Sequence, residues 1–219
     1  MALGRRLGIV GSGDVARSLG RGFAAHGYTV MLGSRDPAKL DAWRKEVGGT
    51  VSVGTVAQAV GFAPTVILAT HGSATEGVLD AVGASAFSGK LVIDATNPID
   101  ASGVSSGGGV GLLWGVTDSL GERVQRRLPD AKVVKCFNTV ASIKMVDPKF
   151  ASGPARMWVC GNDPAAKRAV EAIVRDVGWG GTLDVGGIDA ARWLEALVPL
   201  WMRAGLLLGT WDHMLQPVT

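Results

Sequence analysis

The first residues whose types and spacing suit a chemical task form a glycine-rich turn near the start of the chain. An apolar run from Leu7 to Val10 ends in Gly-Ser-Gly-Asp-Val-Ala, residues 11–16, and a helical pattern follows. The first glycine permits a tight turn, the second lets a pyrophosphate approach the backbone, and the alanine lets strand and helix pack closely. Free N–H groups and the dipole at the helix start attract phosphates. An ordinary strand-to-helix turn is the alternative. The predicted phosphate contacts are Gly11, Ser12, Gly13, Asp14 and Val15.

The residues after the second predicted strand, Tyr28–Gly33, decide between two cofactors. An NAD site usually has an Asp or Glu here, ~20 residues beyond the glycines, for the ribose 2′-hydroxyl. This chain has Ser34 and Arg35, and the guanidinium suits a 2′-phosphate through charge-assisted hydrogen bonds. Lys39 adds a third donor, while Asp36 precedes a proline and is expected to cap the next helix. The segment therefore favours NADP over NAD, with a solvated loop charge as the alternative for Arg35.

Polar residues also follow three later predicted strands, at 65–70, 91–95 and 131–137. In an open α/β sheet, ligands bind at the carboxyl ends of the strands. His71 could face the nicotinamide or its ribose, or lie in solvent, and the amide of Asn97 could fix the carboxamide or a ribose. The predicted contacts at these strand ends are Thr70, His71, Asn97, Pro98, Asn138, Thr139 and Val140.

The elements that must position these residues alternate between strand and helix. This alternation predicts an α/β fold with a doubly wound parallel sheet, the Rossmann-type NAD(P)-binding fold. We expect a dinucleotide-binding domain over residues 1–150 and a small C-terminal α/β extension over 151–219, for substrate binding or dimerisation. The extension ends in a long helical element, 189–214, which we expect to be kinked or split at Pro199. The glycine-rich segment 102–111 is either a lid over the site or a disordered insertion.

Composition and charge exclude several other classes of protein. Of the 219 residues, 47% are hydrophobic and 19% charged, which predicts a large core. The net charge of +3 does not call for nucleic acid, and no uncharged apolar run approaches the ~20 residues of a membrane helix. No secretory signal fits the N-terminus. Cys136 and Cys160 lie in apolar runs and are expected to be buried free thiols. We therefore expect a cytoplasmic protein without nucleic-acid or membrane partners.

Several segments beyond the glycine turn resemble one family of enzymes. They are Gly33-Ser34-Arg35 with Lys39, Lys135-Cys-Phe-Asn-Thr139, Cys160-Gly-Asn-Asp163, Asp184-Val-Gly186 and Arg192-Trp-Leu-Glu195. Together they resemble the NADPH-dependent reductases of the deazaflavin coenzyme F420, and the related cytosolic domain of six-transmembrane metalloreductases. The resemblance covers nearly the whole chain. It implies that Ser34, Arg35 and Lys39 bind the 2′-phosphate and that Ser12 contacts a phosphate. Asp36 departs from the family, which often has a second Arg there.

The proton donors that mark other nucleotide-fold reductases are missing from the sequence. A short-chain dehydrogenase uses Tyr-x-x-x-Lys, but Tyr28 is the only tyrosine and lies in a predicted strand. We find neither a His/Cys cluster for a metal nor a nucleophile paired with a base. We therefore predict no catalytic side chain and no metal ligand. This pattern fits direct hydride transfer between two flat redox cofactors, for which the protein supplies orientation and water exclusion.

Three functions stay open at this stage. The first is hydride transfer between NADP(H) and a deazaflavin, the second is NADPH-dependent reduction of flavin or another small acceptor, and the third is a non-enzymatic NADP sensor. The sequence identifies neither the acceptor nor the direction of the reaction. Apolar residues on more than one face of the last helix favour a homodimer, with burial in the chain's own core as the alternative.

Overall fold

One sheet of eight strands organises the structure, a computed structural model that describes residues 4–100 and 110–217. In order across the sheet, the strands are β3 (Val51–Gly54), β2 (Thr29–Gly33), β1 (Arg6–Val10), β4 (Thr65–Leu68), β5 (Leu91–Asp94), β8 (Lys132–Lys135), β9 (Met157–Gly161) and β10 (Thr182–Asp184). The six strands from β3 to β8 run parallel. The strand order reverses between β1 and β4, which is where a doubly wound sheet binds its ligand. The predicted fold class is confirmed.

The last two strands depart from the parallel order. β9 runs antiparallel to β8, and β10 pairs in parallel with β9. Residues 136–156, between β8 and β9, contain one short 3-10 turn, η4 (Ser142–Lys144), and no crossover helix. The chain therefore re-enters the sheet at the edge from which it left, which makes the pair antiparallel. These strands lie in the predicted extension 151–219 but continue the main sheet, and the domain boundary near residue 150 stays a prediction.

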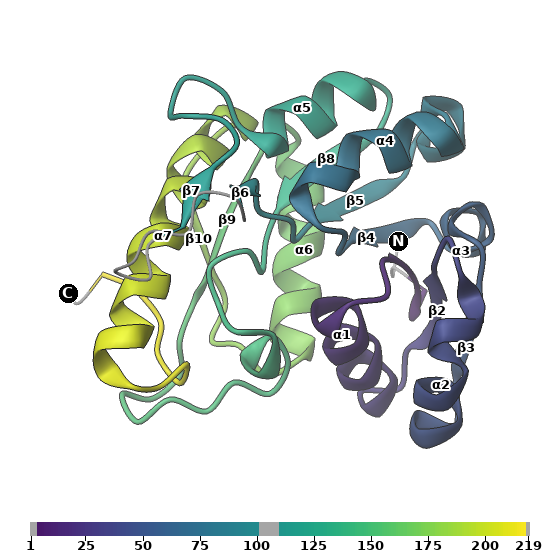
Figure 1. Cartoon of the computed structure of the whole chain (residues 1–219), viewed down its shortest axis with the longest axis horizontal. Coiled ribbons are helices and arrows are strands. Elements are labelled where there is room, and N and C mark those ends of the chain that lie inside the picture. The colour runs from purple at the N-terminus through teal and green to yellow at the C-terminus, as the bar shows by residue number, and fades with distance from the viewer. Residues whose placement is uncertain (1–3, 101–109, 218–219) are drawn as a thin grey trace.

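Helices cover both faces of the sheet (Figure 1). One face packs on helices α1 (Asp14–Ala25), α2 (Asp41–Val47) and α6 (Pro164–Asp176), and the other on α3 (Val56–Phe62), α4 (Gly72–Val82), α5 (Leu120–Arg127) and α7 (Ala191–Leu208). Successive residues of a strand point to opposite faces. In β4, for example, Ile67 joins the core under α1, whereas Val66 and Leu68 join the core under α4. In Figure 1, α7 lies at the opposite end of the molecule from β2 and β3.

The helix expected after Asp36 is divided in two. A 3-10 turn, η1 (Pro37–Leu40), precedes α2, and Asp36 occupies the cap position without a side-chain cap bond. Its backbone N–H instead donates to Ser34 Oγ at 3.1 Å. The carboxylate of Asp36 is consequently left to interact with other charges.

The last helix is shorter than predicted and is not split. A 3-10 turn, η5 (Ile188–Ala190), leads into α7, which continues past Pro199 and ends at Gly209 in the left-handed conformation. A proline removes one backbone hydrogen bond from a helix, and packing of the buried face holds this helix together. Beyond it the chain folds back, so that the rings of His213 and Trp201 stack with centroids 5.2 Å apart.

A small hairpin that the sequence did not indicate follows β5. It pairs β6 (Ile99–Asp100) with β7 (Gly111–Leu112), and a further 3-10 turn, η2 (Ala84–Phe87), precedes β5. The hairpin flanks the glycine-rich segment, whose residues 102–109 lie outside the described part of the chain. Both cysteines, Cys136 and Cys160, are buried and free as predicted. Within the described residues, no helix is long and apolar enough to cross a membrane.

Candidate dinucleotide site

A cleft of about 520 Å³ opens at the carboxyl ends of β1, β2, β4 and β5. It gathers four loops that lie far apart in the sequence, at the switch point where such sheets bind dinucleotides. The predicted contacts that line it are Gly11, Ser12, Gly13, Asp14, Val15, Ser34, Arg35, Thr70, His71 and Asn97. The predicted contacts outside this lining are Lys39, Pro98, Asn138, Thr139 and Val140.

The glycine-rich turn forms the floor of the cleft between β1 and α1. Gly11 has a φ of +143°, and a Cβ there would lie 2.3 Å from the carbonyl oxygen of Ala69, so this position requires glycine. Gly13 caps α1 without a side-chain bond, and a Cβ there would meet nothing within 4 Å. The helix start therefore faces open space with unshared N–H groups. This arrangement fits a pyrophosphate.

The residues after β2 place the positively charged side chain of Arg35 at the cleft. Ser34 is buried, whereas Arg35 is exposed and has neither a hydrogen bond nor an ion pair within residues 4–100 and 110–217. Lys39 is outside the lining, with Nζ 3.8 Å from a carboxylate oxygen of Asp36. Two of the three predicted 2′-phosphate donors thus lie at the cleft, and the third lies beside an acid that competes for it.

The start of α4 forms the opposite rim. His71 is the cap residue of α4 and is exposed, with Nδ1 2.9 Å from Ser73 Oγ. Thr70 Oγ1 lies 2.8 Å from Thr75 Oγ1. Both side chains of this rim are therefore held by residues of the first helical turn.

A pair of asparagines joins the end of β5 to the end of β8. Asn97 Nδ2 donates to the carbonyl oxygen of Asn138 at 2.7 Å, and Asn138 Nδ2 donates to Asn97 Oδ1 at 3.1 Å and to the carbonyl oxygen of Leu194 at 3.0 Å. Phe137 precedes the second asparagine with φ +68°, a conformation that is unfavourable for a non-glycine residue. Asn138, Thr139 and Val140 are all buried, and of the three it is Asn138 that bonds to the cleft residue Asn97.

Four residues near this pair were missed by the sequence interpretation. Lys135 and Asp94 lie opposite each other at the ends of β8 and β5, fully buried, with Nζ 2.9 Å from a carboxylate oxygen. Glu195 of α7 and Thr96 complete the cluster. Burial acts to lower the pKa of Lys135, but the two carboxylates outweigh it and raise that pKa above its ordinary value. A charged residue ending each of two apolar strands was the available signal, because buried charges require partners.

The described residues offer binding groups rather than reactive ones. They contain no group of His, Cys, Asp and Glu that could hold a metal ion. Burial raises the pKa of Cys160 to about 12 and that of Cys136 well above its ordinary value, so neither thiol is a ready nucleophile. The cleft can therefore bind and orient a dinucleotide.

Comparisons with known proteins agree with this geometry. The family described as NADP oxidoreductase, coenzyme F420-dependent, matches residues 6–98. A crystal structure of a candidate F420-dependent NADP reductase from Arthrobacter sp. FB24 superposes with a TM-score of 0.90 and 35% identity, covering 98% of this chain and 99% of that one.

Two curated relatives match over most of this chain. The F420-dependent NADP reductase of Methanothermobacter marburgensis is 28% identical over 207 residues, which is 90% of either protein. Metalloreductase STEAP3 of Rattus norvegicus is 28% identical over 213 residues, but this chain spans only 39% of that protein's length. These matches confirm the resemblance predicted from the sequence. With the glycine turn, Ser34 and Arg35 in one cleft, the chain belongs to the coenzyme F420-dependent family of NADP oxidoreductases.

Proposed function

We propose that the cleft binds NADP(H) and that the protein transfers hydride between NADP(H) and a deazaflavin such as coenzyme F420. The observation that carries the NADP(H) part is the guanidinium of Arg35 beside Ser34, which has no partner in the described part of the chain and lies in the same cleft as the glycine turn. Family membership and the similarity to an F420-dependent NADP reductase support the deazaflavin part. In this proposal NADPH supplies a hydride, which is two electrons and one proton.

The lining residues have separate tasks in this proposal. Gly11, Gly13 and the start of α1 hold the pyrophosphate. Ser34 and Arg35 hold the 2′-phosphate. Asn97, whose amide is fixed by Asn138, lies at the other end of the cleft and orients the nicotinamide portion. The protein thus contributes binding and orientation, and the chemistry belongs to the two cofactors.

The experiment that tests this function is NADPH oxidation with coenzyme F420, FMN, FAD and a ferric chelate as parallel acceptors. We expect the highest kcat/KM with coenzyme F420. A higher value with a flavin or with ferric iron would replace the proposed acceptor, and the similarity to metalloreductases is the reason for including iron. NADPH binding without turnover on any acceptor would support a sensor.

We also propose that the protein is a homodimer that pairs through α7. Apolar side chains on this helix and just beyond it are exposed, with 73% of Leu207 and 62% of Trp193 accessible. The other exposed apolar residues of this segment are Leu200, Leu206, Leu208 and Trp211. Many large exposed apolar side chains on one helix are typical of an interaction surface, which supports the proposal.

Light scattering at micromolar concentration tests the dimer. We expect a dimer that becomes monomeric in the double variant Leu200→Asp, Leu207→Asp, because the symmetric contact would bury four carboxylates, two from each partner. Ile143→Asp, which changes an equally exposed apolar residue on η4, is the matched control and should stay dimeric. A monomeric unmodified protein, or a double variant that stays dimeric, would disprove the interface.

A further inference from the structure

The ammonium of Lys135 sits in a complete cage of acceptors between β5, β8 and α7. Its Nζ donates to Asp94 Oδ2 at 2.9 Å, to the carbonyl oxygen of Thr96 at 2.7 Å and to Glu195 Oε1 at 2.7 Å. An ammonium group has three protons, and here each has an acceptor. The cluster is dry, since none of the three charged side chains is more than 3% exposed. Its three charged groups are therefore held in one fixed arrangement by their mutual bonds.

The backbone and side-chain polar groups of Thr96 form hydrogen bonds with this cluster. Its backbone N–H and its hydroxyl both donate to Asp94 Oδ1, at 3.0 and 2.6 Å, while its carbonyl oxygen accepts from Lys135. Thr96 and the next residue, Asn97, line the dinucleotide cleft. The buried charges consequently fix the backbone from which Asn97 projects.

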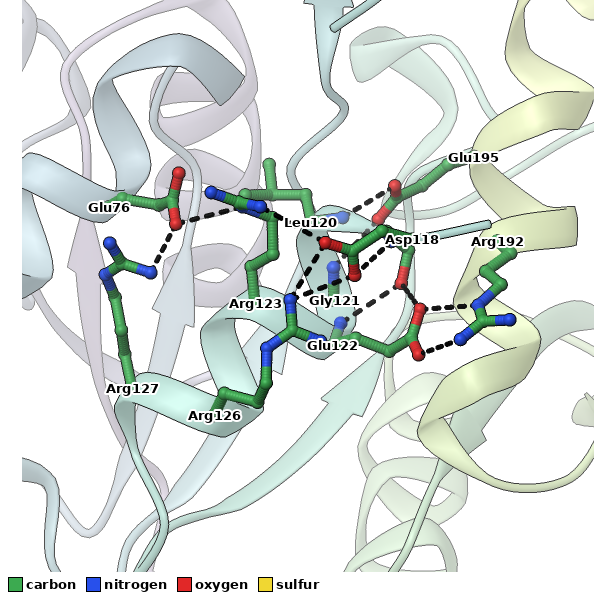
Figure 2. A network of polar contacts seen from close by, with 11 residues as sticks. Glu76, Asp118, Leu120, Gly121, Glu122, Arg123, Arg126, Arg127, Arg192 and Glu195 are labelled. Atoms are coloured by element: carbon green, nitrogen blue, oxygen red, sulfur yellow. Dashed lines mark hydrogen bonds and ion pairs between the residues drawn. The ribbon is translucent and has the colours of Figure 1, made fainter. Parts of the chain in front are cut away.

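The same cluster ties this edge of the cleft to the last helix. Glu195 of α7 accepts the backbone N–H groups of Leu120 and Gly121, each at 2.9 Å, and so caps α5 (Figure 2). A carboxylate is favourable at a helix start, which offsets the excess negative charge of the cluster. A Cβ on Gly121 would lie 2.7 Å from the Cβ of Ala191, so α5 and α7 approach closely at this point.

A second, separate ion pair joins α5 to α7. Arg192 Nε and Nη2 donate to the two carboxylate oxygens of Glu122, at 2.8 and 2.6 Å, which is a bidentate contact (Figure 2). Arg192 is one third exposed, and its two hydrogen bonds to Glu122 do not involve Thr96 or Asp94. It therefore shares the helix-docking role of Glu195 without the connection to the cleft.

Stability alone does not explain a buried ion cluster. Moving charged groups out of water costs so much free energy that a protein is often as stable, or more stable, when well-packed apolar residues replace a buried ion pair. A fully bonded polar network, in contrast, specifies one arrangement of the groups it holds. In this chain the group with the most bonds to the network is the cleft residue Thr96.

We propose that Lys135, Asp94 and Glu195 are positioning residues that set the nicotinamide end of the cleft by holding Thr96 and Asn97. The inference rests on the proposed function and adds to it the residues that align the reacting end of NADP(H). It separates the two ends of the site: the 2′-phosphate end depends on Ser34 and Arg35, and the nicotinamide end depends on the cluster.

The test compares two ligands in three proteins. The ligands are NADPH and adenosine 2′,5′-bisphosphate, which carries the 2′-phosphate but no nicotinamide. The proteins are the unmodified chain, Glu195→Gln, in which an amide N–H₂ faces donors in the cluster, and the control Glu122→Gln, which weakens the other contact between α5 and α7. Titration gives both dissociation constants, and thermal unfolding reports the loss of stability.

We expect Glu195→Gln to raise the dissociation constant of NADPH at least fivefold and to leave that of the bisphosphate within twofold of its original value. We also expect it to lower kcat at saturating NADPH about tenfold or more, because small misplacements of reacting groups slow the reaction strongly. Glu122→Gln should lower the Tm but leave the ratio of the two dissociation constants, for NADPH and for the bisphosphate, unchanged. Equal weakening of both ligands, or the same ratio change in the control, would overturn the inference. If Glu195→Gln does not fold, Thr96→Val, which deletes one hydroxyl bonded to Asp94, must show the same ratio change or the inference fails.

The outcome also separates this inference from the proposed function. Unmodified protein that does not bind NADPH would refute the proposed function and this inference together. Unmodified protein that binds NADPH and transfers hydride, with an unchanged affinity ratio in Glu195→Gln, would refute the inference alone.

Discussion

Replacement of Arg35 by alanine tests the cofactor preference most directly. The guanidinium lies at the cleft beside Ser34 and has no competing partner among the described residues. Its removal should therefore affect the bound ligand rather than the fold. We expect weaker binding of NADPH, which carries the 2′-phosphate, and unchanged binding of NADH, which lacks it.

The expected magnitude follows from the exposure of the side chain. A hydrogen bond to a charged group contributes about 1.5–3 kcal/mol, which corresponds to a roughly ten- to hundredfold change in the dissociation constant. Because Arg35 is exposed, solvent screening places the loss near the lower end of that range. The loss should also shrink as salt is added, since exposed charges are screened within about 10 Å at 0.1 M.

The assay is titration of NADPH and NADH into unmodified protein, Arg35→Ala and two further variants. Arg44→Ala, an exposed arginine on α2 outside the cleft, is the matched control and should bind both cofactors normally. Asp36→Asn should have the opposite effect and tighten NADPH binding by less than about fivefold, because it releases Lys39 from an exposed ion pair. Equal affinity of the unmodified protein for NADPH and NADH, or equal losses for both cofactors in Arg35→Ala, would refute the reasoning.

Two further expectations concern His71 and Glu122. His71→Ala should lower kcat by less than the 10²–10⁴-fold typical of a lost general acid or base; a larger loss with NADPH affinity intact would identify this imidazole as a proton donor. The ion pair with Arg192 holds the pKa of Glu122 below its ordinary value of 4.5, so its stabilising effect is present above pH 4.5 and is lost as pH falls through the lower folded value. The Tm difference between unmodified protein and Glu122→Gln should therefore shrink in acid, and a constant difference from pH 7 to pH 3 would contradict this.

The fold was predictable because its signals are local. Each parallel strand is a short apolar run, and α6 begins at Pro164 and ends at Asp176 as its cap and periodicity indicate. What escaped prediction depends on neighbours far away in the chain. The direction of β9 is set by the route of residues 136–156, and the hairpin of β6 and β7 pairs strands two residues long, too short for a periodic pattern. Pro199 was expected to kink or split the last helix; the helix is not split, because its buried face is packed.

The two ends of the proposed cofactor site differ in the same way. The phosphate end is built from short segments, the glycine turn and Ser34–Arg35, so that spacing along the sequence was enough to find the residues that line the cleft there. The other end is assembled from three separate elements. The contacts predicted there at Asn138, Thr139 and Val140 stay predictions; the three residues are buried and outside the cleft lining, and Asn138 bonds to the lining residue Asn97. The position of a residue at the end of a strand indicates which edge of the sheet it lies on, but it does not indicate how deeply the side chain is buried.

This difference has a consequence for function. Arg35, a proposed ligand of the 2′-phosphate, is exposed in the loop after β2 and can be exchanged without disturbing the core. In our proposal the nicotinamide end instead depends on Lys135, whose partners come from β5 and α7, and on the carbonyl oxygen of Leu194, which accepts a hydrogen bond from Asn138. A shift in the position of α7 should therefore displace groups at the nicotinamide end of the cleft before it displaces groups at the phosphate end. If α7 is also the proposed dimer contact, we expect association of two chains to act on the rate of the proposed hydride transfer more than on the choice between NADP and NAD.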